Sequence, residues 1–438
     1  MMHPSNISKS YLFKLSIPIF FSNLAIPLVG IVDTVLMGHL NNPSFLAAAG
    51  IATSVMSLLF WSFGFLRMGT VGLVSQSYGK SDYRELVKII LRNLVIAFGI
   101  SVIVILLQFP ILFLVDLFFQ TSNETSLLIK KYISLRVYSA PAELTIYVLV
   151  GFYLGLQKTK ISSFFISVFS ILNILLSVFL VTELNLEITG VVLGTLISAY
   201  ITVIIFLIYT YFYIVKNFRI IPRFQKLIVK KKLYKLLHIN FDIFIRTLLL
   251  TFAFLWVNYQ GSKLGEDYLA INVILMQFII LASFLLDAFA FSTEGVVGFA
   301  VGRKVKNSFL KVARNAFELS FFTSLTISLL YIIFFKLIIN SITDIDSLRF
   351  LAYGYIFWII IVPPIASFCY QFDGVFIGAS QTKEMRNTMI FSVVIFVFIS
   401  EYLTKIYGNH GLWFAFLVFM ILRSLSLNFY FNKILKKF

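Results

Sequence analysis

The chain has 438 residues, of which 60% are hydrophobic and 13% are charged, about half the charged fraction of a soluble domain. This balance excludes a soluble globular fold, and the single cysteine, Cys369, excludes a disulfide framework and a cysteine-based metal site. The formal net charge of +17 is expected to follow membrane topology and lipid-surface attraction, so no nucleic-acid partner is expected.

The apolar segments predict twelve membrane-spanning helices. Each run is long enough to cross a bilayer and lacks the alternation of a barrel strand. The spans are expected at 14–40, 45–78, 87–113, 129–155, 161–182, 187–214, 238–260, 268–301, 308–338, 348–379, 388–405 and 410–432. The predicted fold class is therefore an all-α, multi-pass membrane protein.

The first span combines a carboxylate with two prolines. Asp33 lies inside it, where a charged residue costs about 2.5–3.5 kcal/mol by insertion scales and is kept when it faces protein or a watery cavity. Pro18 and Pro27 cannot donate backbone hydrogen bonds and predict hinge points. Asp33 is thus a candidate titratable trigger on a bendable helix; the alternative is a structural carboxylate paired with a neighbour.

The fifth and sixth spans place polar residues at a similar height. At about 1.5 Å per residue, Asp33 and Thr195 lie about 28 Å from the basic ends of their helices, Ser177 lies about 24 Å up, and Asn173 lies one turn below it. Such oxygen and amide groups suit a proton or a hard cation such as Na⁺. We expect these four residues to form a coupling site. Arg67 lies at only about 16 Å, which disfavours a salt bridge with Asp33.

Four methionines are candidates for an adaptable apolar substrate pocket because their side chains are flexible and polarisable. They are Met37, Met56, Met68 and Met276. The alternative is simple packing between helices. No P-loop, GxSxG or HExxH pattern is found, so no enzyme activity, no cofactor and no metal other than Na⁺ at Asp33 are expected.

The chain also repeats itself at a constant offset of 223 residues. Corresponding pairs include Gly72 and Gly295, Pro141 and Pro364, Gly151 and Gly374, Gly155 and Gly378, and Thr159 and Thr382. The offset predicts two parallel six-helix lobes, 1–214 and 236–438, joined by a basic linker at 215–235, with the transport path between them. The linker and the other basic loops lie on the side that carries both termini, which the positive-inside rule places in the cytoplasm.

The C-terminal lobe holds its own ionisable residues. Asp242 and Arg246 are four residues apart, which predicts a structural pair on one helix. A possible second cation site comprises Asp287, Glu294 and Asp373 with Arg246; an interhelical hydrogen-bond network is the alternative.

Five stretches of the chain carry a family pattern: IPLVGIVDTVLMGHL, FGFLRMGTVGLVSQSYGKSD, FDIFIRTLLLTFAF, FLLDAFAFSTEGVVGFAVGRK and DGVFIGASQTKEMRNTMIFS. Together they resemble the multidrug and toxic compound extrusion (MATE) family, in particular its bacterial DinF-like branch. The resemblance implies twelve helices in two lobes around a central V-shaped cleft. It also implies that Asp33 is the first-helix acid that carries the coupling cation, with Asn173 and Thr195 as polar partners. Ser177 departs from the family pattern, in which many relatives have an aspartate.

The expected function is a cation-coupled multidrug efflux antiporter that exchanges amphipathic, often cationic compounds for H⁺ or Na⁺. The partners expected are small-molecule substrates and membrane lipids, and the protein is expected to be a monomer in the bacterial cytoplasmic (inner) membrane. The alternative is a lipid or lipid-linked oligosaccharide flippase of the same superfamily. A flippase would need several cationic residues facing the cleft, and the candidates are Arg67, Arg136, Arg246 and Arg423.

Overall fold

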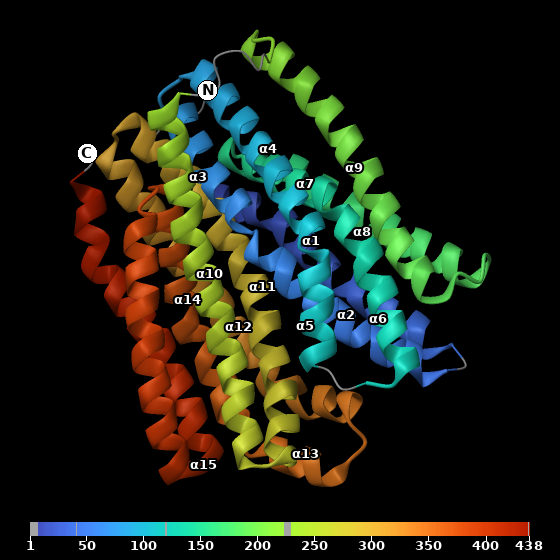
Figure 1. Ribbon diagram of the computed structural model, residues 1–438. Helices are drawn as coiled ribbons and strands as arrows, with labels where there is room; N and C mark the ends of the chain where they lie inside the picture. Colours follow the sequence, from blue (N-terminus) through green and yellow to red (C-terminus); the bar gives the residue numbers. More distant parts are fainter. Residues whose placement is uncertain (1–7, 41, 119–120, 223–228, 437) are drawn as a thin grey trace. The chain divides into compact units, whose positions relative to one another are not determined.

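A computed structural model describes residues 8–40, 42–118, 121–222, 229–436 and 438, and this part of the chain contains helices and no strands. The helices, labelled in Figure 1, are α1 (Lys9–Gly38), α2 (Pro43–Ser62), α3 (Phe65–Gly79), α4 (Tyr83–Leu106), α5 (Gln108–Phe118), α6 (Asn123–Arg136), η2 (Val137–Ser139), α7 (Ala140–Gly155), α8 (Thr159–Thr182), α9 (Glu187–Phe218), α10 (Lys230–Leu264), α11 (Glu266–Arg303), α12 (Lys306–Ile342), α13 (Asp346–Tyr353), α14 (Ile356–Gly378) and α15 (Thr382–Leu435). Residues 223–228 of the predicted linker lie outside the described part.

The number of membrane spans agrees with the sequence. Eleven stretches of the described chain are long and apolar enough to cross a bilayer, and α15, the longest of them, joins two helices across a kink at Gly408. Gly408 has φ +58°, a left-handed conformation that glycine adopts without the steric penalty of a side chain. Counting both parts of α15, the described chain has the twelve predicted spans. Two of them join successive helices: α2 with α3, and α6 with η2 and α7.

The described chain divides into two compact units. One, the C-terminal unit, comprises the start of α1 up to Phe20 together with His238–Phe438; the other, the N-terminal unit, comprises Phe21–Leu237. Contacts with α11 hold the start of α1 in the C-terminal unit: Ser16 Oγ and Ser292 Oγ share a hydrogen bond of 2.8 Å, and the Phe13 and Phe289 rings are 6.4 Å apart. The single helix α1 therefore belongs to both units, a division that the sequence pattern did not reveal.

The repeat is present in the helix packing within each unit. A Cβ added at Gly151 of α7 would lie 2.5 Å from the Arg67 carbonyl oxygen of α3, and one added at Gly374 of α14 would lie 2.7 Å from the Ala290 carbonyl oxygen of α11. Both members of the first contact precede those of the second by 223 residues. The glycines let each pair of helices approach to backbone contact. The two units thus share one helix crossing, as the constant offset predicts.

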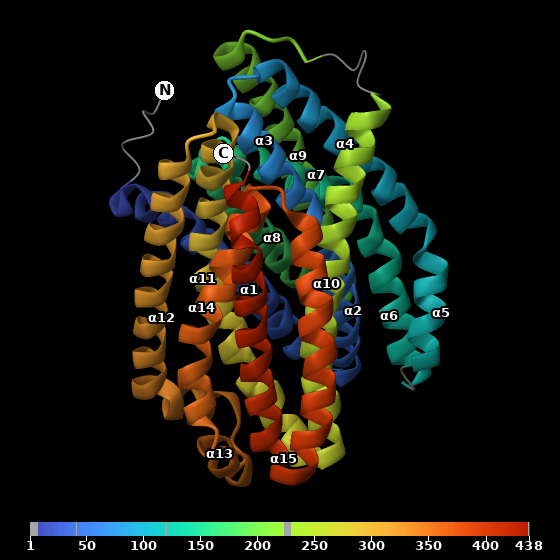
Figure 2. The same ribbon diagram turned by 90° about the vertical axis from the view of Figure 1, so that its left-hand side faces the viewer.

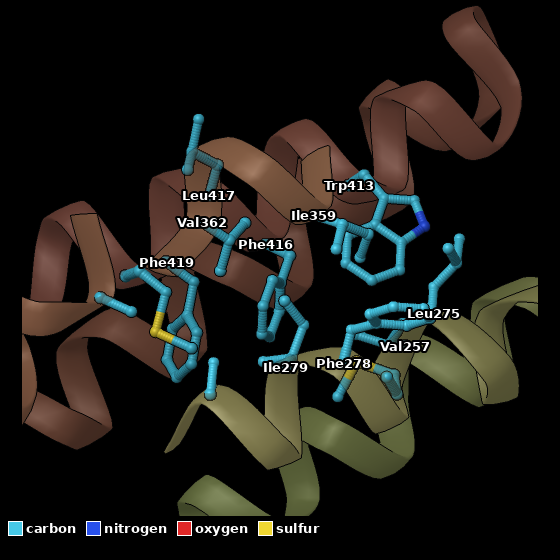
Figure 3. Close-up of a cluster of buried hydrophobic side chains, with 14 of the residues drawn as sticks. Val257, Leu275, Phe278, Ile279, Ile359, Val362, Trp413, Phe416, Leu417 and Phe419 are labelled. Carbon is cyan, nitrogen blue, oxygen red and sulfur yellow. The ribbon is translucent and has the colours of Figure 1, made fainter. Parts of the chain in front are cut away.

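The hydrophobic core of the C-terminal unit fills the space between α10, α11, α12, α14 and α15. Figure 3 shows Phe278 and Ile279 of α11 opposite Phe416 and Phe419 of α15. At the edge of this core, Trp413 Nε1 donates a 2.9 Å hydrogen bond to the Asn272 side chain, so the indole brings no unsatisfied donor into the apolar interior. Cys369 and Tyr370 of α14 belong to this core, and Asp373, described below, lies one turn further along the same helix.

Candidate functional site

Three of the predicted coupling residues form a buried hydrogen-bonded chain in the N-terminal unit. Asn173 Nδ2 on α8 donates to Thr195 Oγ1 on α9 at 3.0 Å, and Ser177 Oγ donates to Asn173 Oδ1 at 3.3 Å. Asn173 and Ser177 are one helical turn apart, so they share a face of α8. These hydrogen bonds link α8 to α9, and the Ser177 hydroxyl lies toward Asp33 of α1.

Asp33 completes this cluster from α1. Its half-buried carboxylate faces the Ser177 hydroxyl and lies within electrostatic range of Arg136. One carboxylate oxygen, Oδ1, is buried and accepts no hydrogen bond from the part of the chain that the structure describes. The structure therefore brings together all four residues selected from the sequence, and their role in coupling stays a prediction.

The structure adds Arg136 and Glu143, which the sequence analysis did not assign to the site. Arg136, at the junction of α6 and η2, forms an ion pair with Glu143 of α7 and lies 4.7 Å from the Phe60 ring centroid. The two charges are seven residues apart, a spacing that covers two helical turns. This spacing is the only signal in the sequence for the ion pair, because no sequence pattern marks the 3₁₀ turn that separates the two helices. Arg136 also acts electrostatically on Asp33, so it supplies a positive charge near that carboxylate.

The prolines and methionines are placed more widely. Helix α1 is continuous from Lys9 to Gly38, with Pro18 in the portion that belongs to the C-terminal unit and Pro27 in the portion that belongs to the N-terminal unit. Met37 and Met56 are buried and Met68 is half-buried in the N-terminal unit, whereas Met276 is buried in the core of the C-terminal unit. This placement favours a packing role for Met276; pocket lining by the other three stays a prediction.

The predicted pair between Asp242 and Arg246 is wrong. Arg246 instead forms an ion pair with Asp373 of α14, while Asp242 accepts hydrogen bonds from Arg386 at 2.7 Å and Thr382 at 3.0 Å. A spacing of four residues shows only that two side chains share a helix face. Here each finds an opposite charge on a different helix.

Asp373 is the centre of a buried charge network in the C-terminal unit. Its Oδ2 accepts hydrogen bonds from Arg246 and from Arg423, the latter at 2.8 Å, and the three side chains are between 1% and 9% exposed. Asp287 lies within electrostatic range of the neighbouring Cys369. Glu294 is buried on α11. Two guanidinium groups thus already neutralise the Asp373 carboxylate. This arrangement favours the interhelical hydrogen-bond network over a second cation site.

Comparisons with known proteins identify the family. A family model described as MatE matches residues 18–179 and 243–403, one range in each half of the repeat. The chain belongs to the MatE, or MATE, family. It is 35% identical over 420 residues to DNA damage-inducible protein F of Escherichia coli K12, covering 96% of this chain and 91% of that protein. It is also 24% identical over 268 residues to the multidrug export protein MepA of Staphylococcus aureus, covering 60% of this chain and 58% of MepA.

Solved MATE structures share the fold. A MOP superfamily transporter from Pyrococcus furiosus superposes with a TM-score of 0.89 at 17% identity, covering 98% of this chain and 96% of that one. A mutant of the Vibrio cholerae MATE transporter VcmN superposes with a TM-score of 0.87 at 18% identity, covering 98% of this chain and 97% of that one. The protein is therefore a multi-pass membrane transporter of the MATE family and not an enzyme.

Proposed function

We propose that this MATE protein is a cation-coupled multidrug efflux antiporter that exports amphipathic, often cationic compounds in exchange for inward H⁺ or Na⁺. Relatives named as a multidrug export protein and a multidrug resistance transporter support the substrate class. The observation that carries the coupling proposal is the buried Oδ1 of Asp33, which has no hydrogen-bond partner in the described chain.

A buried carboxylate oxygen without a partner is costly, and a proton or a monovalent cation would satisfy it. Neutral hydroxyl and amide groups face Asp33 from α8 and α9, and Ser177 contributes no second carboxylate. The one charge noted near it, Arg136, is paired with Glu143. A proton needs only the one carboxylate, whereas Na⁺ is held better by several oxygen ligands. We therefore favour H⁺ as the coupling ion, with no cofactor and with the monomer as the working unit.

Helix α1 offers a route from Asp33 to the other unit. Asp33 lies in the portion of α1 packed within the N-terminal unit, and Ser16 on the same helix is hydrogen-bonded to Ser292 of the C-terminal unit. Each proline removes one backbone hydrogen bond from α1, so the helix can bend near Pro18 or Pro27. Such a bend would change the angle between the two portions of α1. Loading of Asp33 would bias that bend and weaken the substrate site.

Purified protein in liposomes tests the function directly. With a cationic dye inside, we expect an imposed pH gradient to drive dye export and a Na⁺ gradient alone to drive little. Empty liposomes under the same gradients are the control for passive leakage. Equal export under the two gradients would contradict the preference for H⁺ and show that either ion can drive transport. Export driven by neither gradient would contradict antiport.

The arginines do not favour the flippase alternative. Arg136 is paired with Glu143, and Arg246 and Arg423 are both paired with Asp373. Charges neutralised within the protein are less available to hold an anionic lipid headgroup along a transport path. Three of the four candidate residues are therefore used in other contacts.

We also propose that the protein lies in the bacterial inner membrane with both termini and the basic loops in the cytoplasm, as the positive-inside rule expects. A Cys369→Ser background with Lys231→Cys should resist an impermeant thiol reagent added to intact cells. The matched variant Asp346→Cys, on an exposed residue near the start of α13, should be labelled. Labelling of Lys231→Cys and protection of Asp346→Cys would reverse the orientation.

A further inference from the structure

The C-terminal unit carries an apolar groove outside the coupling site, on the flank of the hydrophobic core, which it meets at Ile365 and Ile421. The groove encloses about 600 Å³ and lies along α12, α14 and the second part of α15, which run beside one another in Figures 1 and 2. Its apolar lining comprises Leu310, Ala313, Phe317, Ile365, Phe368, Phe372, Ile421, Leu425 and Phe431. On α12 and α14 these residues recur every three or four positions, and on α15 they do so once Ser424 and Asn428 are counted with them, so each helix contributes one face.

The groove spans one half of the membrane. On α12 its lining residues lie about 6–17 Å from the first residue of the helix, and on α15 they lie about 6–21 Å from the last. Both helix ends lie on the side of the basic loops, next to Arg303, Lys304 and Lys306 and to Lys433 and Lys436. Since the hydrocarbon core is about 30 Å thick, the groove covers the depth of one leaflet, the one at the basic side.

Polar groups lie along the same groove. Ser424 and Asn428 line it from α15, and Arg314 lines it from α12 with a side chain that is 80% exposed. Arg314 lies eight residues, about 12 Å, from the basic end of α12, a distance over which a long cationic side chain can reach the headgroup level. Glu318 pairs with both Arg314 and Lys9. Two cations therefore share one carboxylate, which leaves one net positive charge at the groove.

We propose that this groove is a binding site for one anionic phospholipid of the leaflet at the basic side. An acyl chain would occupy the apolar channel against Phe317 and Phe368, whose rings are 6.1 Å apart, and the phosphate would contact Arg314. The volume lies in the range of small-molecule pockets, and the lining is apolar with few polar groups, as such sites require. The proposal does not depend on the transport mechanism.

Lipid retention by the purified full-length protein tests the site. After delipidation in detergent and addition of phosphatidylglycerol or phosphatidylcholine, bound lipid is counted by native mass spectrometry. We expect one phosphatidylglycerol to bind in preference to phosphatidylcholine. Arg314→Gln should weaken its binding about fivefold, the usual effect of one basic residue near an anionic lipid. Lys311→Gln, an exposed charge on the same helix outside the groove, is the matched control and should bind as the parent does.

Filling the groove gives a second, independent variant. Ser424→Trp should abolish binding, whereas Leu329→Trp, at an exposed position of α12 away from the groove, should not. Unchanged melting temperatures would show that the variants remain folded. Equal binding of the two lipids, or equal binding of phosphatidylglycerol by the parent and Arg314→Gln, would overturn the proposal. Displacement of the lipid by a cationic dye at the same groove would also overturn it, because the groove would then hold the transported compound.

Discussion

Asp33→Asn protein is expected to fold, to insert and to lose dye export driven by a pH gradient. Asparagine has nearly the shape of a protonated aspartic acid but cannot ionise, so the variant should hold the conformation of the loaded transporter. Antiport requires that proton and substrate bind with opposite preferences, which is a coupling free energy between two sites. Fixing one partner in its loaded form removes that coupling. Dye affinity should therefore fall and stop responding to pH, whereas the parent should bind dye less tightly as the pH is lowered.

The controls separate this effect from general damage. Asp33→Glu keeps an ionisable group and should retain part of the export. Asp116→Asn removes a carboxylate from the same unit, but one that is about 41% exposed and paired with Lys130, so it should export dye at the parent rate. Near-parent export by Asp33→Asn in liposomes under a proton gradient would exclude Asp33 as the coupling residue.

Asp373→Asn is expected to reduce the yield of folded protein severely. The carboxylate neutralises two buried guanidinium groups, and removal of one partner of a buried ion pair typically costs about 3–5 kcal/mol because it leaves an uncompensated charge. Thermal unfolding of the detergent-solubilised protein measures the effect. Asp344→Asn, which alters a fully exposed carboxylate of the same unit, should unfold like the parent.

A combined substitution tests whether this network is structural. The triple variant Arg246→Met, Asp373→Leu, Arg423→Met replaces all three charges with apolar groups of similar size, and buried ion pairs replaced in this way often leave stability unchanged or improved. We expect it to fold better than Asp373→Asn and to transport. A well-folded triple variant without transport would assign part of the coupling to the C-terminal unit.

The sequence predicted most of the fold because the hydrophobic length of each span and the 223-residue offset are direct consequences of bilayer thickness and duplication. It also predicted the cluster of Asp33, Asn173, Ser177 and Thr195, since helix rise fixes their heights. Height alone could not reveal that α1 divides between two units, because that division depends on long-range contacts such as Ser16 with Ser292.

The errors in the site have a common physical cause. Spacing along one helix predicts which side chains share a face, but a buried charge is neutralised by whichever helix packs against that face. Arg246 therefore pairs with Asp373 of α14 rather than with Asp242. In the same way, the helix break at η2 brings Arg136 to Glu143 across a junction that no periodic pattern marks.

The central claim, that Asp33 holds a proton which substrate binding displaces, is tested most directly by measuring proton release. Purified protein in weakly buffered detergent solution is mixed with a saturating cationic dye while the pH is followed. The account predicts that the parent releases protons as dye binds and that Asp33→Asn, at dye concentrations that still saturate it, releases none. Equal proton release by both proteins would contradict the account.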